Sequence, residues 1–550
     1  MFKKTHILFA LILLFGLFIR MVGISEQGLT SDEITWTKRS TEYVAQIFEP
    51  FNIAYMKKYE GYDGYPLNNE GRKSYPFNIR VGTPHPGTGN ALLMGFSIYL
   101  FGEDTSSFTR NLLPDYVAAR VPQIIFGTIA IVVLYLLGTI FFNQNIGLVA
   151  SGILSFEPLA VGLSRLAHID MALTFGLLVA NIFYLLGCMK DKKYFIYSGV
   201  FWGWSLSLKP YAWFFLVAII SWQVLVIILS WLGIKRLDDL SPQRLIYLVK
   251  GHLNLVIIGV LVFIIFYPNL WSNLFPNLIS YFKSFLSLPQ VRMDNTYNFP
   301  TIKSYYITYG LLHITIPMLI FCLIGILGIL RDIKLEYNTS KLHKETALLY
   351  FVFFTFIYIL MLSLPGGKKE ARNMVVIFPY LSLLGAIGFF LLTEFMCKII
   401  PHKLGIRTAY TILFLIFVPS YIGSYTTYYP YVHIYTNTMF GNPQEWKPMD
   451  LIAGTEADIE IAKYIQEKGY KDITCFFSPQ GLKRYLHGYE ISGTSDIEKI
   501  KRSDIFVYYP KYYFGDPYSD LSQWLENKKP TQIFKKGKLE MARIYENLND

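Results

Sequence analysis

Residues 119–142 read ARVPQIIFGTIAIVVLYLLGTIFF, and Arg120 is their one charged side chain. About 20 consecutive apolar residues are enough to cross a bilayer as a helix, so this segment predicts a membrane span. The chain contains eleven such runs, which predicts an α-helical polytopic membrane protein. We expect the spans at residues 7–24, 119–142, 146–163, 172–189, 194–208, 211–232, 253–270, 306–330, 347–364, 374–396 and 409–429.

The composition agrees with this fold class. Of the 550 residues, 53% are hydrophobic and only 16% are charged, against about 25% in soluble proteins. The net charge is +11, but the last 120 residues hold 33 charged side chains with a net charge of −1. The basic excess therefore belongs to the apolar part. This argues against a nucleic-acid partner and for charges sorted by membrane side.

The basic residues also predict the orientation. Residues 1–24 are either a signal peptide or a first span, and the length of the run and the lack of a small-residue cleavage site favour a span. With a cytoplasmic N-terminus, the inner segments hold 16 basic residues, as expected for a multi-pass protein of the cell membrane. These are Lys3, Lys4, Lys190, Lys192, Lys193, Lys235, Arg236, Arg244, Lys250, Arg331, Lys334, Lys341, Lys344, Lys398, Lys403 and Arg407.

Two domains are expected. Residues 1–430 form the transmembrane domain, and residues 25–118 are its first extracytoplasmic loop, in which residues 89–101 form an interfacial or re-entrant helix. An odd number of spans leaves residues 431–550 outside, where their composition predicts a small soluble α/β domain. There we expect helices at 456–467 and around Trp524, and strands at 472–477, 504–509 and 542–545.

The predicted outer face carries the candidate site residues. Asp32 and Glu33 follow the first span, where a carboxylate either acts as a general base or simply begins a solvated loop. His85, within Thr83-Pro84-His85-Pro86-Gly87, is either a site residue in a rigid turn or part of a capped turn. Basic residues at the outer helix ends either snorkel to lipid or form one phosphate site. These are Arg120, Arg165, Lys209, Lys368, Lys369 and Arg372.

These motifs together resemble a known family. The acidic pair Asp32-Glu33, the turn His85-Pro86, Ser164-Arg165 followed by Asp170, and the late basic link before Val375 resemble the protein O-mannosyltransferase and aminoarabinose transferase group of the glycosyltransferase C superfamily. The resemblance covers residues 1 to about 430. Two positions depart from its pattern, since Gly87 replaces a second proline and Asn373 replaces an aromatic residue.

The resemblance implies a membrane enzyme that transfers a sugar from a polyprenyl-phosphate carrier to a protein, glycan or lipid acceptor, with membrane lipids as its other partner. Asp32 would be the catalytic base and Glu33 its neighbour. His85 would lie at the entrance of the site. Arg165 and Asp170 would support the catalytic loop or the carrier phosphate, and Lys369 and Arg372 would contact that phosphate. No cofactor is required by this chemistry, and a divalent metal is possible but not indicated.

Two other functions remain open at this point. A transporter or flippase of lipid-linked saccharides would use the same basic face without transfer, although intramembrane acids that could couple transport are scarce, Glu157 being the clear one. A polymerase or ligase of cell-surface glycans would use a pyrophosphate-linked donor. The acidic pair beside the His-Pro turn favours transfer chemistry.

Overall fold

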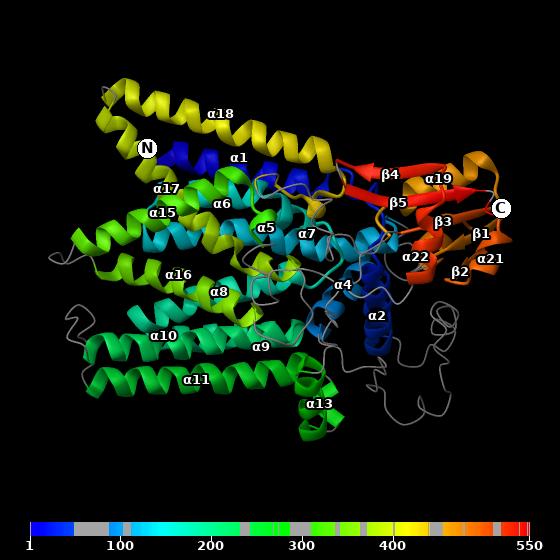
Figure 1. Cartoon of the computed structure of the whole chain (residues 1–550). Coiled ribbons are helices and arrows are strands. Elements are labelled where there is room, and N and C mark those ends of the chain that lie inside the picture. Colours follow the sequence, from blue (N-terminus) through cyan, green and yellow to red (C-terminus); the bar gives the residue numbers. More distant parts are fainter. Residues whose placement is uncertain are drawn as a thin grey trace.

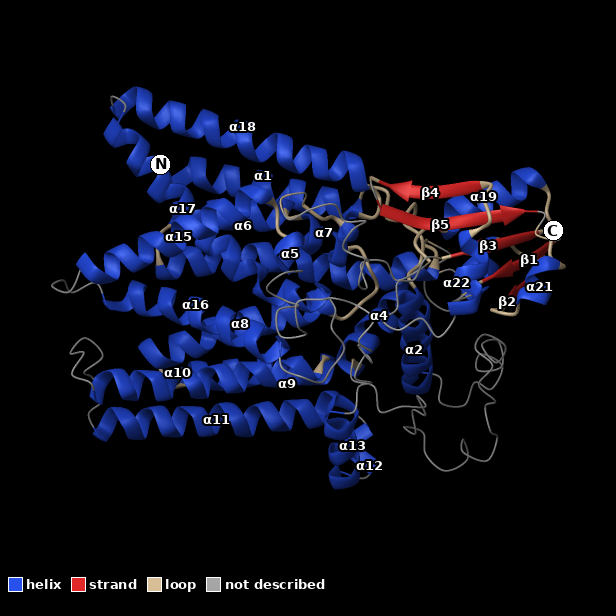
Figure 2. Ribbon diagram, in the orientation of Figure 1, coloured by secondary structure: helices blue, strands red, loops and turns tan. Residues whose placement is uncertain are grey.

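The computed structural model describes residues 2–48, 87–102, 112–231, 242–267, 269–272, 274–286, 310–335, 342–363, 371–399, 402–437, 439, 455–476, 479–509, 519–537, 539–546 and 548. A bundle of long helices forms the larger part of the molecule, and a small sheet domain lies at one end of it (Figure 1). Among the described residues, all strands belong to that domain (Figure 2). The N-terminus lies at the opposite end of the bundle.

Each of the eleven predicted spans overlaps a helix in the part of the chain that the structure describes. Seven helices of the described part are long and apolar enough to cross a membrane, or eight if the bent pair α6–α7 is one span, so the number eleven itself stays a prediction. The helices that overlap the predicted spans are the following, with α6 and α7 sharing one span. They are α1 (Phe2–Met21), α5 (Asp115–Phe141), α6 (Gln144–Phe156), α7 (Pro158–Ser164), α8 (Asp170–Met189), α9 (Lys193–Leu208), α10 (Trp213–Trp231), α11 (Pro242–Phe266), α15 (Ile316–Leu335), α16 (Leu342–Ser363), α17 (Phe378–Ile399) and α18 (His402–Tyr428).

The span predicted at 146–163 is bent by 64° between α6 and α7. The bend begins at Glu157, which is buried and precedes Pro158. The Glu157 carboxylate accepts hydrogen bonds from the backbone N–H and the hydroxyl of Thr315, at 2.8 and 3.0 Å, and from the hydroxyl of Tyr421 at 2.9 Å. This intramembrane acid therefore joins the start of α15 and the middle of α18 to the bend.

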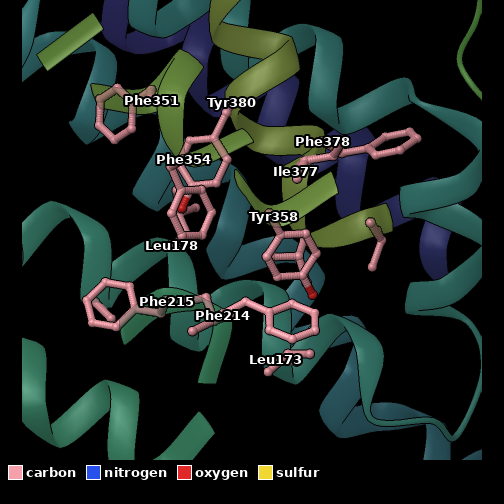
Figure 3. Packing of buried hydrophobic residues seen from close by; sticks show 14 of the residues in the cluster. Leu173, Leu178, Phe214, Phe215, Phe351, Phe354, Tyr358, Ile377, Phe378 and Tyr380 are labelled. Carbon is pink, nitrogen blue, oxygen red and sulfur yellow. The ribbon is translucent and has the colours of Figure 1, made fainter. Parts of the chain in front are cut away.

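A large aromatic core fixes the short helix that carries Arg372. This 3-10 helix, η5 (Ala371–Ile377), continues into α17, and its last four residues are buried. Around the start of α17, the rings of Phe354 and Tyr380 have centroids 5.1 Å apart, and those of Phe214 and Tyr358 are 5.5 Å apart (Figure 3). Burial of these side chains holds the end of η5 and the start of α17 in place, so that Arg372 lies just before a fixed segment.

Two helices of the predicted first extracytoplasmic loop also lie at the end of the bundle that bears the sheet domain (Figure 1). The expected helix at 89–101 is α4 (Thr88–Phe101), and α2 (Ser31–Phe48) is a helix that the sequence analysis does not predict. They pack closely, since a Cβ added at Gly95 of α4 would lie 2.1 Å from the carbonyl oxygen of Ser40 in α2. Two short helices after α11, α12 (Asn269–Ser272) and α13 (Leu274–Leu286), lie at this end too (Figure 2).

The C-terminal domain has the expected α/β character. Its sheet has the strand order β2-β1-β3-β5-β4, in which β1 pairs in parallel with β2 and β3, while β5 is antiparallel to β3 and β4. All the elements expected here are found, together with β2, β4 and two further helices. The elements are α19 (Asp458–Lys468), β1 (Asp472–Cys475), α20 (Pro479–Tyr485), β2 (Glu490–Gly493), α21 (Ile497–Lys501), β3 (Ile505–Tyr508), α22 (Ser519–Glu526), β4 (Gln532–Lys536) and β5 (Leu539–Glu546).

Close glycine contacts predict how the helices tolerate substitution. A Cβ at Gly203 of α9 would lie 2.1 Å from the carbonyl oxygen of Gly259 in α11, whereas one at Gly423 of α18 would meet nothing within 4 Å. We expect Gly203→Ala to lower the free energy of unfolding by about 1–3 kcal/mol, because the backbones must separate. Gly423→Ala is the matched control. Melting curves of the detergent-solubilised protein that are the same for both variants would contradict this packing.

Candidate active site

Helix α2 begins with a capping box that places Asp32. The backbone N–H of Thr30 donates to Oε2 of Glu33 at 3.0 Å, and the N–H of Glu33 donates to the Thr30 hydroxyl at 3.2 Å. This reciprocal pair satisfies two backbone donors at the helix start. Asp32 is consequently held in the first turn, where the positive end of the helix dipole stabilises a carboxylate. The Thr-x-x-Glu spacing is visible in the sequence and could have predicted α2.

Glu33 also forms a buried ion pair with Arg120. Nε and Nη2 of Arg120 donate to the two carboxylate oxygens of Glu33 at 2.8 and 2.9 Å, and the N–H of Ala167 donates to Oε1 at 2.7 Å. Both side chains are fully buried. Burial alone would raise the pKa of Glu33, but Arg120 and the two backbone N–H groups hold it below its ordinary value. Glu33 thus stays ionised and joins α2 to α5 and to the link before α8.

Arg120 and Arg165 hold the turn between α1 and α2. Arg120 donates to the carbonyl oxygens of Ile24, Gln27 and Gly28 at 2.7–3.0 Å. Arg165 donates to those of Ile19, Val22 and Gly23 at 2.5–3.1 Å, and to the side chain of Gln27 at 3.1 Å. Because these buried guanidinium groups are occupied by protein oxygens, the geometry favours support of the catalytic loop over a phosphate contact for Arg165.

Two side chains from distant segments meet at Asp32. Nη1 of Arg372 lies 2.7 Å from Oδ2 of Asp32 and 2.7 Å from Nε2 of His168, and Oδ2 of Asp32 lies 3.4 Å from the same His168 nitrogen. Asp32 and Arg372 remain 37% and 22% exposed, whereas His168 is buried. The predicted base and one predicted phosphate-binding cation are therefore neighbours that open to solvent.

Asp170 and Lys209 extend this cluster. Oδ2 of Asp170 lies 2.5 Å from Nδ1 of His168, and Oδ1 accepts a hydrogen bond from Nζ of Lys209 at 2.9 Å. Lys209 also donates to the side-chain oxygen of Asn373 at 2.6 Å. Asn373, at a position where the family pattern has an aromatic residue, thus gives Lys209 a second acceptor. The Asp170–Lys209 ion pair and the hydrogen bond from Lys209 to Asn373 join α8, the α9–η2 junction (η2, Pro210–Ala212) and η5.

The sequence analysis did not assign His168 and its supports to the site. Asn90 of α4 donates to the carbonyl oxygen of His168 at 3.2 Å and accepts from Gln123 of α5 at 2.7 Å. The ring of Trp36 in α2 meets the His168 ring edge-on, with centroids 6.2 Å apart. The one feature of the sequence that could have pointed to His168 is its position two residues before Asp170. No spacing in the sequence identifies Asn90 or Gln123 as its partners.

Three predicted site residues, His85, Lys368 and Lys369, lie outside the described residues. Gly87, the described residue nearest to His85 along the chain, donates its N–H to the carbonyl oxygen of Ser207 at 2.8 Å. In the described part of the chain, no group of three or more His, Cys, Asp or Glu side chains could hold a metal ion. The roles expected for these three residues therefore stay predictions.

The C-terminal domain rests on the turn that Arg120 holds. The hydroxyl of Thr455 donates to the carbonyl oxygen of Leu29, and a Cβ added at Gly28 would lie 2.3 Å from the carbonyl oxygen of Glu456. Arg484 of α20 stacks on the ring of Tyr116, 5.4 Å from its centroid. The domain therefore contacts the segment directly before Asp32.

Comparisons with known proteins bear on this arrangement. Residues 112–237 match the family model described as dolichyl-phosphate-mannose-protein mannosyltransferase. No match is found among curated protein sequences. The structure resembles the oligosaccharyltransferase AglB of Archaeoglobus fulgidus, solved with an inhibitory peptide and a dolichol-phosphate, with 12% identity, a TM-score of 0.51, and coverage of 92% of this chain and 70% of AglB.

The chain has the glycosyltransferase C fold. A second solved structure, ArnT of Cupriavidus metallidurans bound to undecaprenyl phosphate, is 13% identical over 97% of both chains, with a TM-score of 0.49. The resemblance predicted from the sequence is confirmed, and the fold is that of a multi-pass membrane protein. The segment that matches the family model contains Arg165, His168, Asp170 and Lys209, whereas Asp32 and Arg372 lie outside it.

The buried Glu33–Arg120 pair predicts a strong stability effect. We expect Glu33→Gln to lower the free energy of unfolding by about 3 kcal/mol at neutral pH, because Arg120 would stay buried without its counter-charge. The pKa of Glu33 is lowered in the folded protein, so its contribution is lost as the pH falls through that pKa, and the two melting curves should converge in acid. The exposed Glu26→Gln is the control. Equal stability of Glu33→Gln and wild type at pH 7 would contradict this account.

The contact at Gly28 predicts that the two domains are coupled. Gly28→Ala would push the backbone of Glu456 away, so we expect faster hydrogen exchange in residues 24–33 and 455–465 together. Hydrogen–deuterium exchange read by mass spectrometry measures both segments. Gly423→Ala serves again as the control, and exchange that rises in neither segment would show that the contact is not needed.

Proposed function

We propose that this chain is an integral-membrane glycosyltransferase that moves a sugar from a polyprenyl-phosphate carrier to an acceptor at the outer face of the membrane. One observation carries the proposal: Asp32, a partly exposed carboxylate, lies 2.7 Å from Arg372, a partly exposed cation, at the end of the bundle that bears the C-terminal domain. A base for the acceptor and a cation for the carrier phosphate are the two groups that this reaction needs within one site.

The reaction follows from these two groups. The hydroxyl or amine of the acceptor gives its proton to Asp32 while its oxygen or nitrogen forms a bond to the anomeric carbon of the sugar. The bond from that carbon to the phosphate oxygen breaks, and its electron pair stays on the carrier phosphate. Arg372 stabilises the negative charge that develops there. Attack opposite to the leaving group inverts the configuration at the sugar carbon.

Other features support roles around this pair. Lys209 holds Asp170 and Asn373 together beside the site, and it adds positive charge near the phosphate. Glu33 and Arg165, which are committed to internal contacts, position the turn and helix that carry Asp32. His85, Lys368 and Lys369 complete the entrance and the phosphate contact in this proposal. The match of residues 112–237 to a dolichyl-phosphate-mannose-dependent family and the dolichol-phosphate bound to AglB support a polyprenyl-phosphate donor.

The orientation is part of the proposal. Sixteen basic residues in the alternate loops support a cytoplasmic N-terminus and a site on the outer side of the cell membrane. Outside, no nucleotide sugar is at hand, which agrees with a lipid-linked donor. Coupled transport finds less support, because Glu157 and Asp170 are engaged by Thr315, Tyr421 and Lys209.

Replacing Asp32 tests the function. Purified protein in liposomes is incubated with radiolabelled polyprenyl-phosphate sugars and a membrane extract, and label in protein, glycan and lipid fractions is counted. We expect wild-type protein to transfer label and Asp32→Asn to lose about 100-fold or more of the rate, because the general base is removed.

Asp191→Asn is the matched control, since Asp191 is an exposed acid paired with Lys193 in the link between α8 and α9. A rate near that of wild type for Asp32→Asn would remove Asp32 from the mechanism. Label that crosses the liposome membrane without reaching any acceptor would instead support the transporter.

A further inference from the structure

We propose that His168 is a proton relay of this site, which receives through Asp32 the proton that the acceptor loses. The inference rests on the proposed function and adds a residue to it. His168 lies between two carboxylates, with Nε2 3.4 Å from Asp32 and Nδ1 2.5 Å from Asp170. Its side chain is 5% exposed, so it reaches the acceptor only through Asp32.

The neighbours of His168 define which nitrogen carries the hydrogen. A guanidinium can donate but cannot accept hydrogen bonds, so the 2.7 Å contact from Arg372 requires a lone pair on Nε2. The hydrogen of the neutral ring is then on Nδ1, facing the buried carboxylate of Asp170. A carboxylate at Nδ1 both orients an imidazole and stabilises its protonated form. His168 is thus prepared to take a proton at Nε2.

Arg372 covers the two atoms that the proton path uses, one on Asp32 and one on His168. Its Nη1 lies 2.7 Å from Oδ2 of Asp32 and 2.7 Å from Nε2 of His168. A carrier phosphate competes for the same guanidinium, because charge-assisted bonds to phosphate are strong and bidentate. When Arg372 turns to the phosphate, Asp32 and His168 face each other directly. Donor binding therefore exposes the base, which discourages turnover before the donor is in place.

The proton path is balanced without any co-reactant. The acceptor loses its proton to Oδ2 of Asp32 as the new glycosidic bond forms and the sugar–phosphate bond breaks. The proton then moves from Asp32 to Nε2 of His168, which restores the Asp32 carboxylate. Imidazole is the side chain that most often acts as general base in catalysis. His168 returns the proton to water after the products leave.

The charges around His168 favour this transfer. Asp32 faces it from α2, Asp170 from α8 and Arg372 from η5, while Lys209 approaches the far oxygen of Asp170 from the α9–η2 junction. With Arg372 on the phosphate, the imidazolium lies between two carboxylates. A histidine with a purely structural role would not need a carboxylate near each of its two ring nitrogens.

Two variants of His168 distinguish a proton relay from a purely structural role. His168→Asn keeps a donor near the position of Nδ1 for Asp170, and His168→Gln keeps a polar group near Nε2 for Arg372, but neither can take up a proton. Full-length protein in liposomes is assayed at saturating donor from pH 5.5 to 8.5. We expect kcat to fall about 100-fold in both, with KM for the donor within twofold of wild type.

The pH profile gives the decisive readout. Wild-type kcat should fall on acidification, because a His168 that is already protonated cannot accept the proton, and this acid limb should be missing in both variants. His252→Gln is the matched control, since His252 is a mostly buried histidine of α11 away from this site, hydrogen-bonded to its own helix at Leu248. It should keep both kcat and the limb.

Several outcomes would overturn the relay. One is a wild-type kcat that does not fall in acid, and another is a His168 variant with normal kcat. The third is a variant whose kcat is lowered but still falls in acid as that of wild type does, which is expected if His168 has only a structural role. The wild-type profile needs no variant, so a wild-type kcat that does not fall in acid overturns the relay even if both substitutions impair folding. Failure of the proposed function is a different result, because wild-type protein would then transfer no sugar at any pH.

Discussion

The buried ion pair between Glu33 and Arg120 is the contact on which the site depends. Glu33 caps the first turn of α2 and at the same time accepts two hydrogen bonds from Arg120 of α5 and one from the backbone of Ala167. Ala167 directly precedes His168, and Asp32 directly precedes Glu33. One carboxylate therefore determines the distance between the proposed base and the proposed relay. A buried pair contributes little net stability but strongly penalises any arrangement that breaks it, which suits a residue that specifies geometry.

The C-terminal domain acts on the same short segment from outside. Arg120 holds the carbonyl oxygens of Ile24, Gln27 and Gly28 from within the bundle, and Thr455 and Glu456 cover Gly28 and Leu29 from the other side. The turn before Asp32 is thus enclosed between two domains. A segment of few residues has little packing of its own, so contacts on both sides are what keep it rigid. This favours a bracing role for the domain, whatever acceptor it also meets.

Much of the bundle could be predicted because apolar runs identify spans without regard to partners. All eleven predicted runs overlap helices of the described chain, and the helix at 89–101 and the strands around 473, 506 and 544 were equally visible. Helix α2 was missed because it is too polar overall to be recognised as a span, and its signal is the capping box at Thr30 and Glu33. Site residues were harder, since spacing along a chain cannot show that His168 meets Asp32, which is 136 positions away.

The outer basic residues have different environments in the folded protein, and the sequence alone could not distinguish them. Arg120, Arg165, Lys209 and Arg372 occupy similar positions at helix ends, and all suggested one phosphate site. In the folded chain Arg120 and Arg165 are buried against carbonyl oxygens, where no phosphate can displace so many bonds at once. Arg372 has a partner, Asp32, on the solvent side and keeps 22% of its side chain exposed. Exposure and the number of internal acceptors, rather than charge or position, distinguish a cation that holds the protein together from the cation proposed to bind the lipid phosphate.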